Sequence, residues 1–279
     1  MAKNRFIVHR NRITRRARID NGTINTKYRD PATTVGEVQV EKSENKIVVT
    51  VPLSYSTLNN STNQITYTLY PTGDLVVNSV FDSKASEMLG RVGMKMELPA
   101  GYENITYYGR GPEENYIDRN TGSLIGVYDN TVDGMFVPYM KPQENGNRTD
   151  VRWVSLTDEE GDGLLFSADV PMEFGALHYS ASELNSKAHP YQLTRSDQIL
   201  FDVGLHANRR WQWKLRPNHA GKVQGQFQQA VHVYLSNASC HRRDKLGRTE
   251  NGTGTKGDYH PDTQRHRGGW TPPARFLAG

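Results

Sequence analysis

The sequence predicts an all-β protein, specifically a large antiparallel sandwich of two sheets with disordered basic ends. In the middle of the chain, apolar and polar residues alternate with a period of two, which is the pattern of strands that bury one face. Short turns containing Pro, Gly or Asn separate these segments, as in an antiparallel meander. Strands with one apolar face need a second layer to cover it, so two sheets must pack face to face.

The alternating segments place the strands in order along the chain. Turns at residues 43–45 and 71–74 separate the early strands, and an acidic turn at 158–163 closes a hairpin between the last two. That acidic turn lacks the ligand spacing of a calcium loop, so a solvated turn is favoured over a calcium site. The predicted strands are residues 37–41, 46–51, 64–70, 75–81, 92–98, 104–108, 151–156 and 163–168.

Less regular segments lie between and after these strands. Residues 120–150 show little periodicity and are predicted to form long loops over one edge, where binding residues tend to lie. Ser180 and Glu183 form a capping-box pattern, which predicts one short helix at 183–187. Residues 189–193 are predicted to return to strand. His178 and His189 have no partner at metal-ligand spacing, which favours loop and strand-edge histidines over ligands.

Composition excludes several classes of protein. The single cysteine, Cys240, rules out a disulfide framework and a thiolate metal cluster. No apolar run is long enough to cross a membrane. The basic N-terminus has no apolar core after it, so we expect no signal peptide, and a cytoplasmic location if this N-terminus is authentic.

Charge divides the chain into three segments. Residues 1–30 carry nine basic and two acidic residues, and residues 209–279 carry thirteen basic and four acidic ones. The remainder, with 12 basic and 24 acidic residues, is strongly acidic. We therefore expect a poorly ordered basic segment at 1–30, a β-sandwich at 31–207, and a basic tail at 208–279.

Basic ends invite a nucleic-acid interpretation through counterion release on phosphate. The two basic ends show no Cys/His spacing of a zinc-binding module and no amphipathic helix. They also lack the aromatic strand pattern of RNA-binding domains. The acidic body would also repel a phosphate backbone. We therefore expect neither nucleic acid nor a membrane as a partner.

One stretch concentrates the polar chemistry: Tyr107-Tyr-Gly-Arg-Gly-Pro-Glu-Glu-Asn-Tyr-Ile-Asp-Arg119. Its glycines and proline fix a specific turn. One interpretation is a corner where Arg119 and a carboxylate lock two strands together, and the other is the rim of a sugar-binding cleft. The first is favoured, because structural ion-pair networks are common. The candidate substrate-binding or structural residues here are Tyr108, Arg110, Glu113, Glu114, Asn115, Tyr116, Asp118 and Arg119.

A second group of candidates lies in the predicted loops. Glu144 and Asn145 belong to the segment Val137-Pro-Tyr-Met-Lys-Pro-Gln-Glu-Asn-Gly-Asn-Arg148. Glu144 is a further carboxylate that could face Arg110 or Arg119.

Residues 93–119 and 137–148 closely resemble two segments of the C-terminal β-sandwich domain, or small chain, of the β-galactosidases of glycoside hydrolase family two. The resemblance covers about residues 34–206. It implies a large two-sheet supersandwich related in shape to galactose mutarotase. It also implies a non-catalytic module that completes and shapes a β-galactosidase active site, with a galactoside and a catalytic large chain as partners.

In that family the catalytic glutamates and the magnesium and sodium ligands belong to a separate barrel domain. The resemblance therefore implies no catalytic residue, no metal and no cofactor in this chain, and leaves open whether the chain counts as an enzyme. Retaining glycosidases need two carboxylates about 5 Å apart. Glu113 and Glu114 do not suit that role, because neighbours on an extended strand point to opposite faces.

The resemblance stops near residue 208. Read one nucleotide later, residues 208–217 can encode a glycine-rich segment similar to the family's active-site loop, and the codons of Trp211 and Trp213 leave little freedom in that reading. We hypothesise that the chain from about 208 onward is translated out of frame. The segment 236–279 has no periodicity, which predicts disorder.

Two other functions remain open from the sequence. A free-standing carbohydrate-binding or mutarotase-like sandwich fits the polar stretch at 107–119 equally well. A non-functional truncated fragment is the third possibility, and it would leave apolar faces and strand edges uncovered, which predicts poor solubility.

Overall fold

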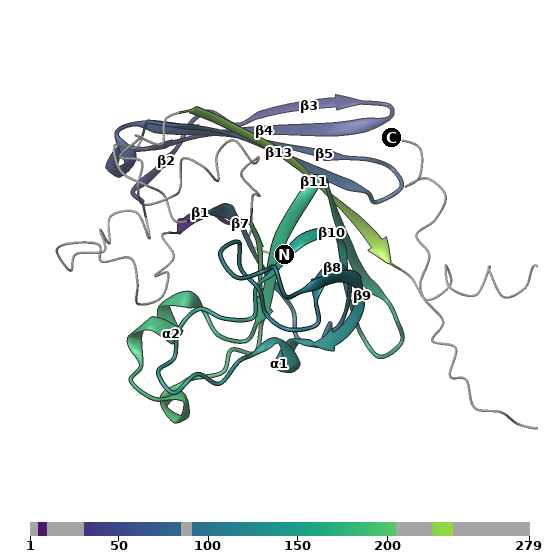
Figure 1. Cartoon of the computed structure of the whole chain (residues 1–279). Coiled ribbons are helices and arrows are strands. Elements are labelled where there is room, and N and C mark those ends of the chain that lie inside the picture. The colour runs from purple at the N-terminus through teal and green to yellow at the C-terminus, as the bar shows by residue number, and fades with distance from the viewer. Residues whose placement is uncertain (1–4, 10–30, 85–90, 205–224, 237–279) are drawn as a thin grey trace, which may run out of the picture. The chain divides into compact units, whose positions relative to one another are not determined.

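The computed structural model describes residues 5–9, 31–84, 91–204 and 225–236, all within one compact unit, Met1–Ala238 (Figure 1). None of the helices in these residues is long and apolar enough to cross a membrane. The helical elements are α1 (Val132–Met135), α2 (Ala181–Ser186) and the 3-10 turns η2 (Ser56–Leu58) and η3 (Pro190–Gln192). The strands are β1 (Arg5–His9), β2 (Thr33–Val35), β3 (Gln39–Ser43), β4 (Lys46–Tyr55), β5 (Ser61–Leu69), β6 (Leu75–Ser83), β7 (Arg91–Leu98), β8 (Asn104–Gly111), β9 (Leu124–Thr131), β10 (Arg148–Thr157), β11 (Gly163–Leu177), β12 (Ile199–Gly204) and β13 (Gly225–Ser236).

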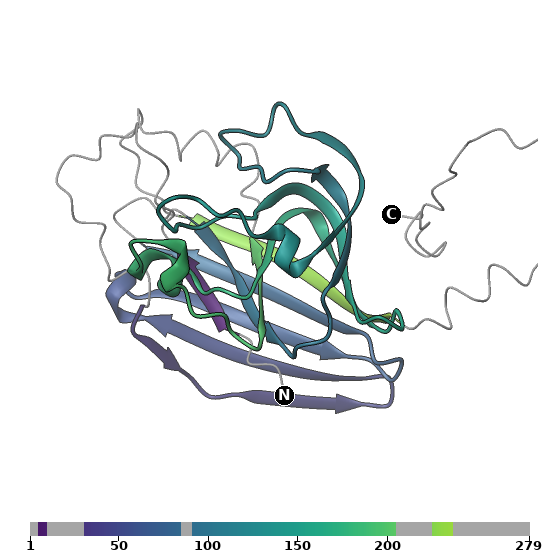
Figure 2. The same cartoon turned by 90° about the horizontal axis from the view of Figure 1, so that it is seen from below.

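The strands form one antiparallel hydrogen-bonded network that divides at β11. Strand β10 pairs with one edge of β11, and on the other edge residues 163–168 pair with β13 while residues 173–177 pair with β12. From β13 the sheet continues through β6, β5 and β4, and from β12 it continues through β7 to β1. Strand β10 leads to β8 and then to β9. Figures 1 and 2 show β3, β4 and β5 in one layer, with β8, β9 and β10 curving away from it.

Both branches of the sheet contribute to one buried apolar cluster. Ile65 and Val77 come from the β5–β6 layer and belong to the same cluster as Phe166, Phe174 and Phe201. The rings of Phe166 and Phe201 lie 4.5 Å apart, between centroids. Burial of large apolar side chains between layers is the main force that holds such a fold together. The prediction of an all-β antiparallel sandwich is confirmed.

Most of the predicted strands are also confirmed. The hairpin across 158–163 forms from β10 and β11, and both strands are longer than predicted. The short helix is α2, which begins two residues earlier than expected. The Ser180 hydroxyl caps it by accepting from the Glu183 amide at 3.0 Å, while the Glu183 carboxylate accepts from the amide of Thr194 instead of completing a capping box.

Two predictions about irregular segments are wrong. Residues 120–150 contain the strand β9, which main-chain pairing with β8 holds in place although its side chains are largely exposed. Residues 189–193 form η3 rather than strand, because Pro190 occupies the first turn of a 3-10 turn.

The expected disorder of both ends does not hold where the structure describes them. β1 pairs with β7, and β13 lies between β6 and β11 with Val231 buried. The remaining predictions about 10–30, 205–224 and 237–279, including Cys240, lie outside the described residues.

Candidate functional site

The polar stretch begins where β8 runs closely against β10. A Cβ atom added to Gly109 would lie 2.6 Å from Cγ2 and 2.9 Å from Cα of Val151. A side chain at this position would therefore push the two strands apart, so glycine is required there. This close contact lets residues 110–119 fold over the start of β10.

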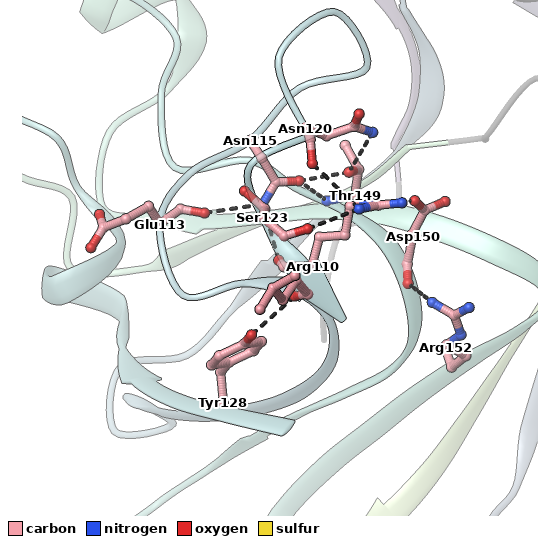
Figure 3. A network of polar contacts seen from close by, with 10 residues as sticks. Arg110, Glu113, Asn115, Asn120, Ser123, Tyr128, Thr149, Asp150 and Arg152 are labelled. Atoms are coloured by element: carbon pink, nitrogen blue, oxygen red, sulfur yellow. Dashed lines mark hydrogen bonds and ion pairs between the residues drawn. The ribbon is translucent and has the colours of Figure 1, made fainter. Parts of the chain in front are cut away.

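Asn115 is the centre of the resulting network (Figure 3). Its side-chain oxygen accepts from the amide and the hydroxyl of Thr149, at 2.9 and 2.6 Å. Its side-chain nitrogen donates to the carbonyls of Arg110 and Glu113, both at 3.0 Å. An asparagine amide has two donors and two lone pairs, and these four bonds use all of them. Asn115 is fully buried and ties the turn to β10.

Glu114 joins the same turn to the segment before β10. Its side chain is 7% exposed, and its carboxylate accepts from Arg119, from the Tyr139 hydroxyl and, at 2.8 Å, from the Gly146 amide. Burial raises the pKa of Tyr139, and its contact with Glu114 raises it further, so the phenol remains a donor. Burial opposes the charge of Arg119, but the hydrogen bond and the charge of Glu114 outweigh this and raise its pKa.

Arg110 and Tyr108 contact a second set of residues. The Arg110 Nε donates to the Asp150 carboxylate at 2.5 Å, and its Nη1 donates to the Ser123 carbonyl at 2.8 Å (Figure 3). The guanidinium of Arg152 lies 5.4 Å from the centre of the Tyr108 ring, within range of a cation–π contact. These contacts fix the loop between β8 and β9 against β10.

Arg148 stands with Glu144 and Asn145 in the predicted loop segment but is not among the candidate site residues, although it is the most deeply buried cation of the region. It is 3% exposed, and it donates to the Tyr107 hydroxyl at 3.0 Å and to the carbonyls of Gly146 and Asn147. Burial raises the pKa of Tyr107, although the neighbouring charge of Arg148 opposes this. Charged residues are rarely fully buried, and nothing in the sequence marks Arg148 as an exception.

The structure separates the predicted candidates into four groups. Tyr108, Arg110 and Asn115 face Thr149, Asp150 and Arg152, whereas Glu114, Tyr116 and Arg119 gather near Tyr139, with the Arg119 guanidinium 4.7 Å from the Tyr116 ring centre. Glu113 and Asp118 are exposed. Glu144 and Asn145 lie elsewhere, in a hollow. The two arginines suggested as partners of Glu144 instead pair with Asp150 and Glu114.

The hollow lies over the pairing of β11 and β12 and has a volume of about 340 Å³, counted to its open mouth. Gly175 and Asp202 pair across the two strands and therefore share one face of the sheet. A Cβ atom added to Gly175 would meet nothing within 4 Å, so this glycine leaves space above the strand. The lining residues are Glu144, Asn145, Asn147, Gly175, Leu177, Tyr179, Ala181, Leu184, Leu200 and Asp202.

Asn145 differs from Asn115 in how its amide is used. It is 4% exposed, its oxygen accepts from the Val137 amide at 3.0 Å, and its nitrogen donates to the Gln143 carbonyl at 2.9 Å. One donor and one lone pair of the four remain beyond these two bonds. Tyr179 also lines the hollow, and its ring packs against Phe136, with ring centroids 4.9 Å apart.

Within the described ranges, no three or more His, Cys, Asp or Glu residues come together as a group that could hold a metal ion. His178, one of the two histidines considered above, is buried and contacts Glu103 and the Ser196 carbonyl, each at 3.0 Å. His189 stacks on Tyr191.

The fold and these two polar regions define an antiparallel β-sandwich whose conspicuous sequence motif builds a turn and whose open polar hollow lies beside it. The family described as beta galactosidase small chain matches residues 3–210. The chain belongs to this family. The matched range ends close to residue 208, where the resemblance was expected to stop, and begins well before residue 34.

Curated relatives agree with the family. The chain is 35% identical over 193 residues to a protein named beta-galactosidase from Priestia megaterium, a match that covers 66% of this chain and 18% of that relative. It is 36% identical over 171 residues to a beta-galactosidase from Halalkalibacterium halodurans, covering 60% of this chain and 17% of that one. The chain therefore spans less than a fifth of the length of these relatives.

Among solved structures, one similar chain is a GalM/aldose epimerase homologue from C. elegans, at 8% identity and a TM-score of 0.39, covering 72% of this chain and 69% of that one. Likeness at this level supports no conclusion about function.

Proposed function

We propose that this chain is a non-catalytic small-chain module of a β-galactosidase, and that it completes the active site of a separate catalytic chain that hydrolyses terminal β-galactosides. The observation that carries the proposal is the family match over residues 3–210, combined with the small share of the relatives that the chain spans. In this proposal most of the enzyme, including its catalytic carboxylates and its magnesium and sodium ions, belongs to the other chain. Neither nucleic acid nor a membrane takes part.

The contacts of the two adjacent glutamates support a non-catalytic role. Glu114 is buried, paired with Arg119 and bonded to the Gly146 amide, while Glu113 is exposed. A retaining glycosidase needs one carboxylate as nucleophile and a second as acid/base, about 5 Å apart and both facing the sugar. A carboxylate held in three contacts within the protein is poorly suited to attack a sugar.

An exposed apolar strand supports a partner chain. Within the described residues β9 pairs only with β8, so its outer edge has free main-chain groups. Leu124, Ile125 and Val127 of this strand are 74%, 43% and 47% exposed. An apolar edge strand invites association, and a partner chain would cover it.

The test is complementation in a cell that has no β-galactosidase of its own. The full chain is co-expressed with the Priestia megaterium relative from which the small-chain region has been removed, and hydrolysis of a chromogenic galactoside is measured. We expect activity only when both chains are present, with the intact relative as the positive control. Hydrolysis by this chain alone, or no gain on co-expression of two soluble chains, would contradict the proposal.

A free-standing carbohydrate-binding module is the second candidate, and the hollow beside Asn145 favours it. Calorimetry separates the two proposals. Galactose binding by the chain without any gain of activity on co-expression would select the free-standing module. A mutarotase-like activity would appear as faster interconversion of galactose anomers.

A further inference from the structure

We propose that the hollow over Gly175 binds a single neutral sugar unit, with Asn145, Glu144 and Asp202 contacting its hydroxyl groups and the Tyr179 ring lying against its apolar face. The choice of galactose as the sugar rests on the function proposed above, whereas the position of the site rests on the structure. This places the sugar outside the turn of residues 107–119, beside Asn147, which bonds to Asn115 of that turn.

The space itself comes from a glycine in the middle of a long strand. Gly175 lies within β11 and faces Asp202 of β12. A glycine inside a strand weakens it and commonly marks the close approach of another group. Since no atom of the described residues lies within 4 Å of the position of its missing Cβ, no part of the described chain explains this glycine. A bound ligand would.

The lining supplies what a sugar requires. Sugar sites combine a few polar groups that fix the hydroxyls with an apolar or aromatic wall. Here Asn145 keeps one donor and one lone pair although it is 4% exposed, and carboxylate oxygens of Glu144 and Asp202 accept from hydroxyls. The Tyr179 ring, with Leu177 and Leu184, forms the apolar side.

Other ligand classes fit less well. Among the described residues of the lining there is no Lys, Arg or His, so an anion such as a phosphate would meet carboxylates and amides there. The described residues hold no group of three or more His, Cys, Asp or Glu suited to a metal ion. The hollow is open on one side and its volume of about 340 Å³ includes solvent at the mouth, so a bound ring would lie on it only partly enclosed.

Two glycines provide a matched pair of variants. Gly175 and Gly122 both have open space at the Cβ position and neither has a positive φ angle. The Gly175→Val side chain fills the hollow, and the Gly122→Val side chain adds the same atoms on an exposed turn outside it. Asp202→Asn keeps the shape of the site and removes one carboxylate, which gives a second variant if Gly175→Val folds poorly.

The experiment is calorimetric titration of the full chain with galactose, with n-butylamine as a cationic probe. We expect millimolar galactose binding that weakens at least tenfold in Gly175→Val, weakens in Asp202→Asn and is unchanged in Gly122→Val. No galactose binding, galactose binding that Gly175→Val and Asp202→Asn leave intact, or binding of n-butylamine but not galactose would overturn the proposal.

Complementation with the Gly175→Val chain separates this proposal from the proposed function. If the unaltered chain fails to restore activity, the proposed function is wrong and the galactose titration still decides the site. If the unaltered chain restores activity and Gly175→Val leaves both the KM for galactoside and galactose binding unchanged, the sugar site is wrong and the proposed function stands.

Discussion

Asn115 and Asn145 are both buried amides in the two segments that resemble the family, yet their surroundings differ. Asn115 makes four side-chain hydrogen bonds and has no capacity left. Asn145 makes two and lines an open hollow. A dense run of polar residues in sequence therefore marks a saturated structural turn, and the candidate binding site lies where a glycine leaves space and the Asn145 amide keeps one donor and one lone pair.

The largest loss of folding stability is expected for the substitution Asn115→Ala. Removing this side chain leaves the buried Thr149 amide and the half-buried Arg110 carbonyl without these partners, and a buried unsatisfied group costs about 1–3 kcal/mol. We predict that the free energy of unfolding falls by about 3 kcal/mol or more in urea denaturation. Asn120→Ala is the control. Asn120 is only half-buried, so this substitution should lower the free energy of unfolding by less than about 1 kcal/mol. Equal effects of the two variants would show that Asn115 is not the centre of the turn.

The second prediction compares alanine at two strand glycines. Gly109→Ala places its Cβ 2.6 Å from Val151 Cγ2, and such overpacking should destabilise the protein by about 2 kcal/mol. Gly175→Ala adds a methyl group to open space and should be neutral or stabilise by about 0.5 kcal/mol, through the lower entropy of the unfolded chain. Thermal unfolding of both variants tests this difference. A destabilised Gly175→Ala protein would mean that the hollow is filled in solution.

The pairing of Glu114 with Arg119 should contribute less than the Asn115 network. Arg119 is 47% exposed, so solvent screens its charge and limits the coupling to about 1 kcal/mol or less. A double-mutant cycle with Glu114→Gln and Arg119→Gln measures the coupling directly. A coupling above about 2 kcal/mol would indicate that this ion pair, rather than Asn115, holds the turn.

The smallest effect concerns the pH dependence of stability at α2. The hydrogen bond from the Thr194 amide, assisted by Lys187, lowers the pKa of Glu183 below its usual value of 4.5. Its ionised form therefore stabilises the folded state above pH 4.5, and this contribution is lost as the pH falls through the lowered pKa. Glu183→Gln should reduce the difference in Tm between pH 7 and pH 3, with Glu113→Gln as the exposed control. If Glu183→Gln has the same difference in Tm between pH 7 and pH 3 as the unaltered chain, Glu183 does not contribute to the pH dependence of stability.

The fold was largely predictable because half-buried strands alternate in sequence. The strand β9 escaped prediction because its apolar residues are exposed at an edge, where pairing rather than burial defines the strand. In β13, Val231 and Val233 are buried and do follow a period of two, but the basic residues on either side suggested a disordered tail.

The site was only partly predictable. Tight turns have local signatures, so the corner at 109–115 could be found from its glycines and proline. The hollow joins residues from segments that are far apart in sequence, Asn145, Gly175 and Asp202 among them. A lone glycine in a strand and an asparagine in a predicted loop carry no signal of this kind until the strands are paired.

The measurement that tests the account most directly is chemical-shift mapping of galactose on the isotope-labelled chain. If the hollow is the sugar site and the turn is structural, the backbone amide signals of Asn145, Gly175 and Tyr179 shift on titration, while those of Glu113 and Arg119 remain in place. Shifts confined to Glu113, Arg119 and their neighbours would contradict the account and restore the turn as the rim of a sugar-binding cleft.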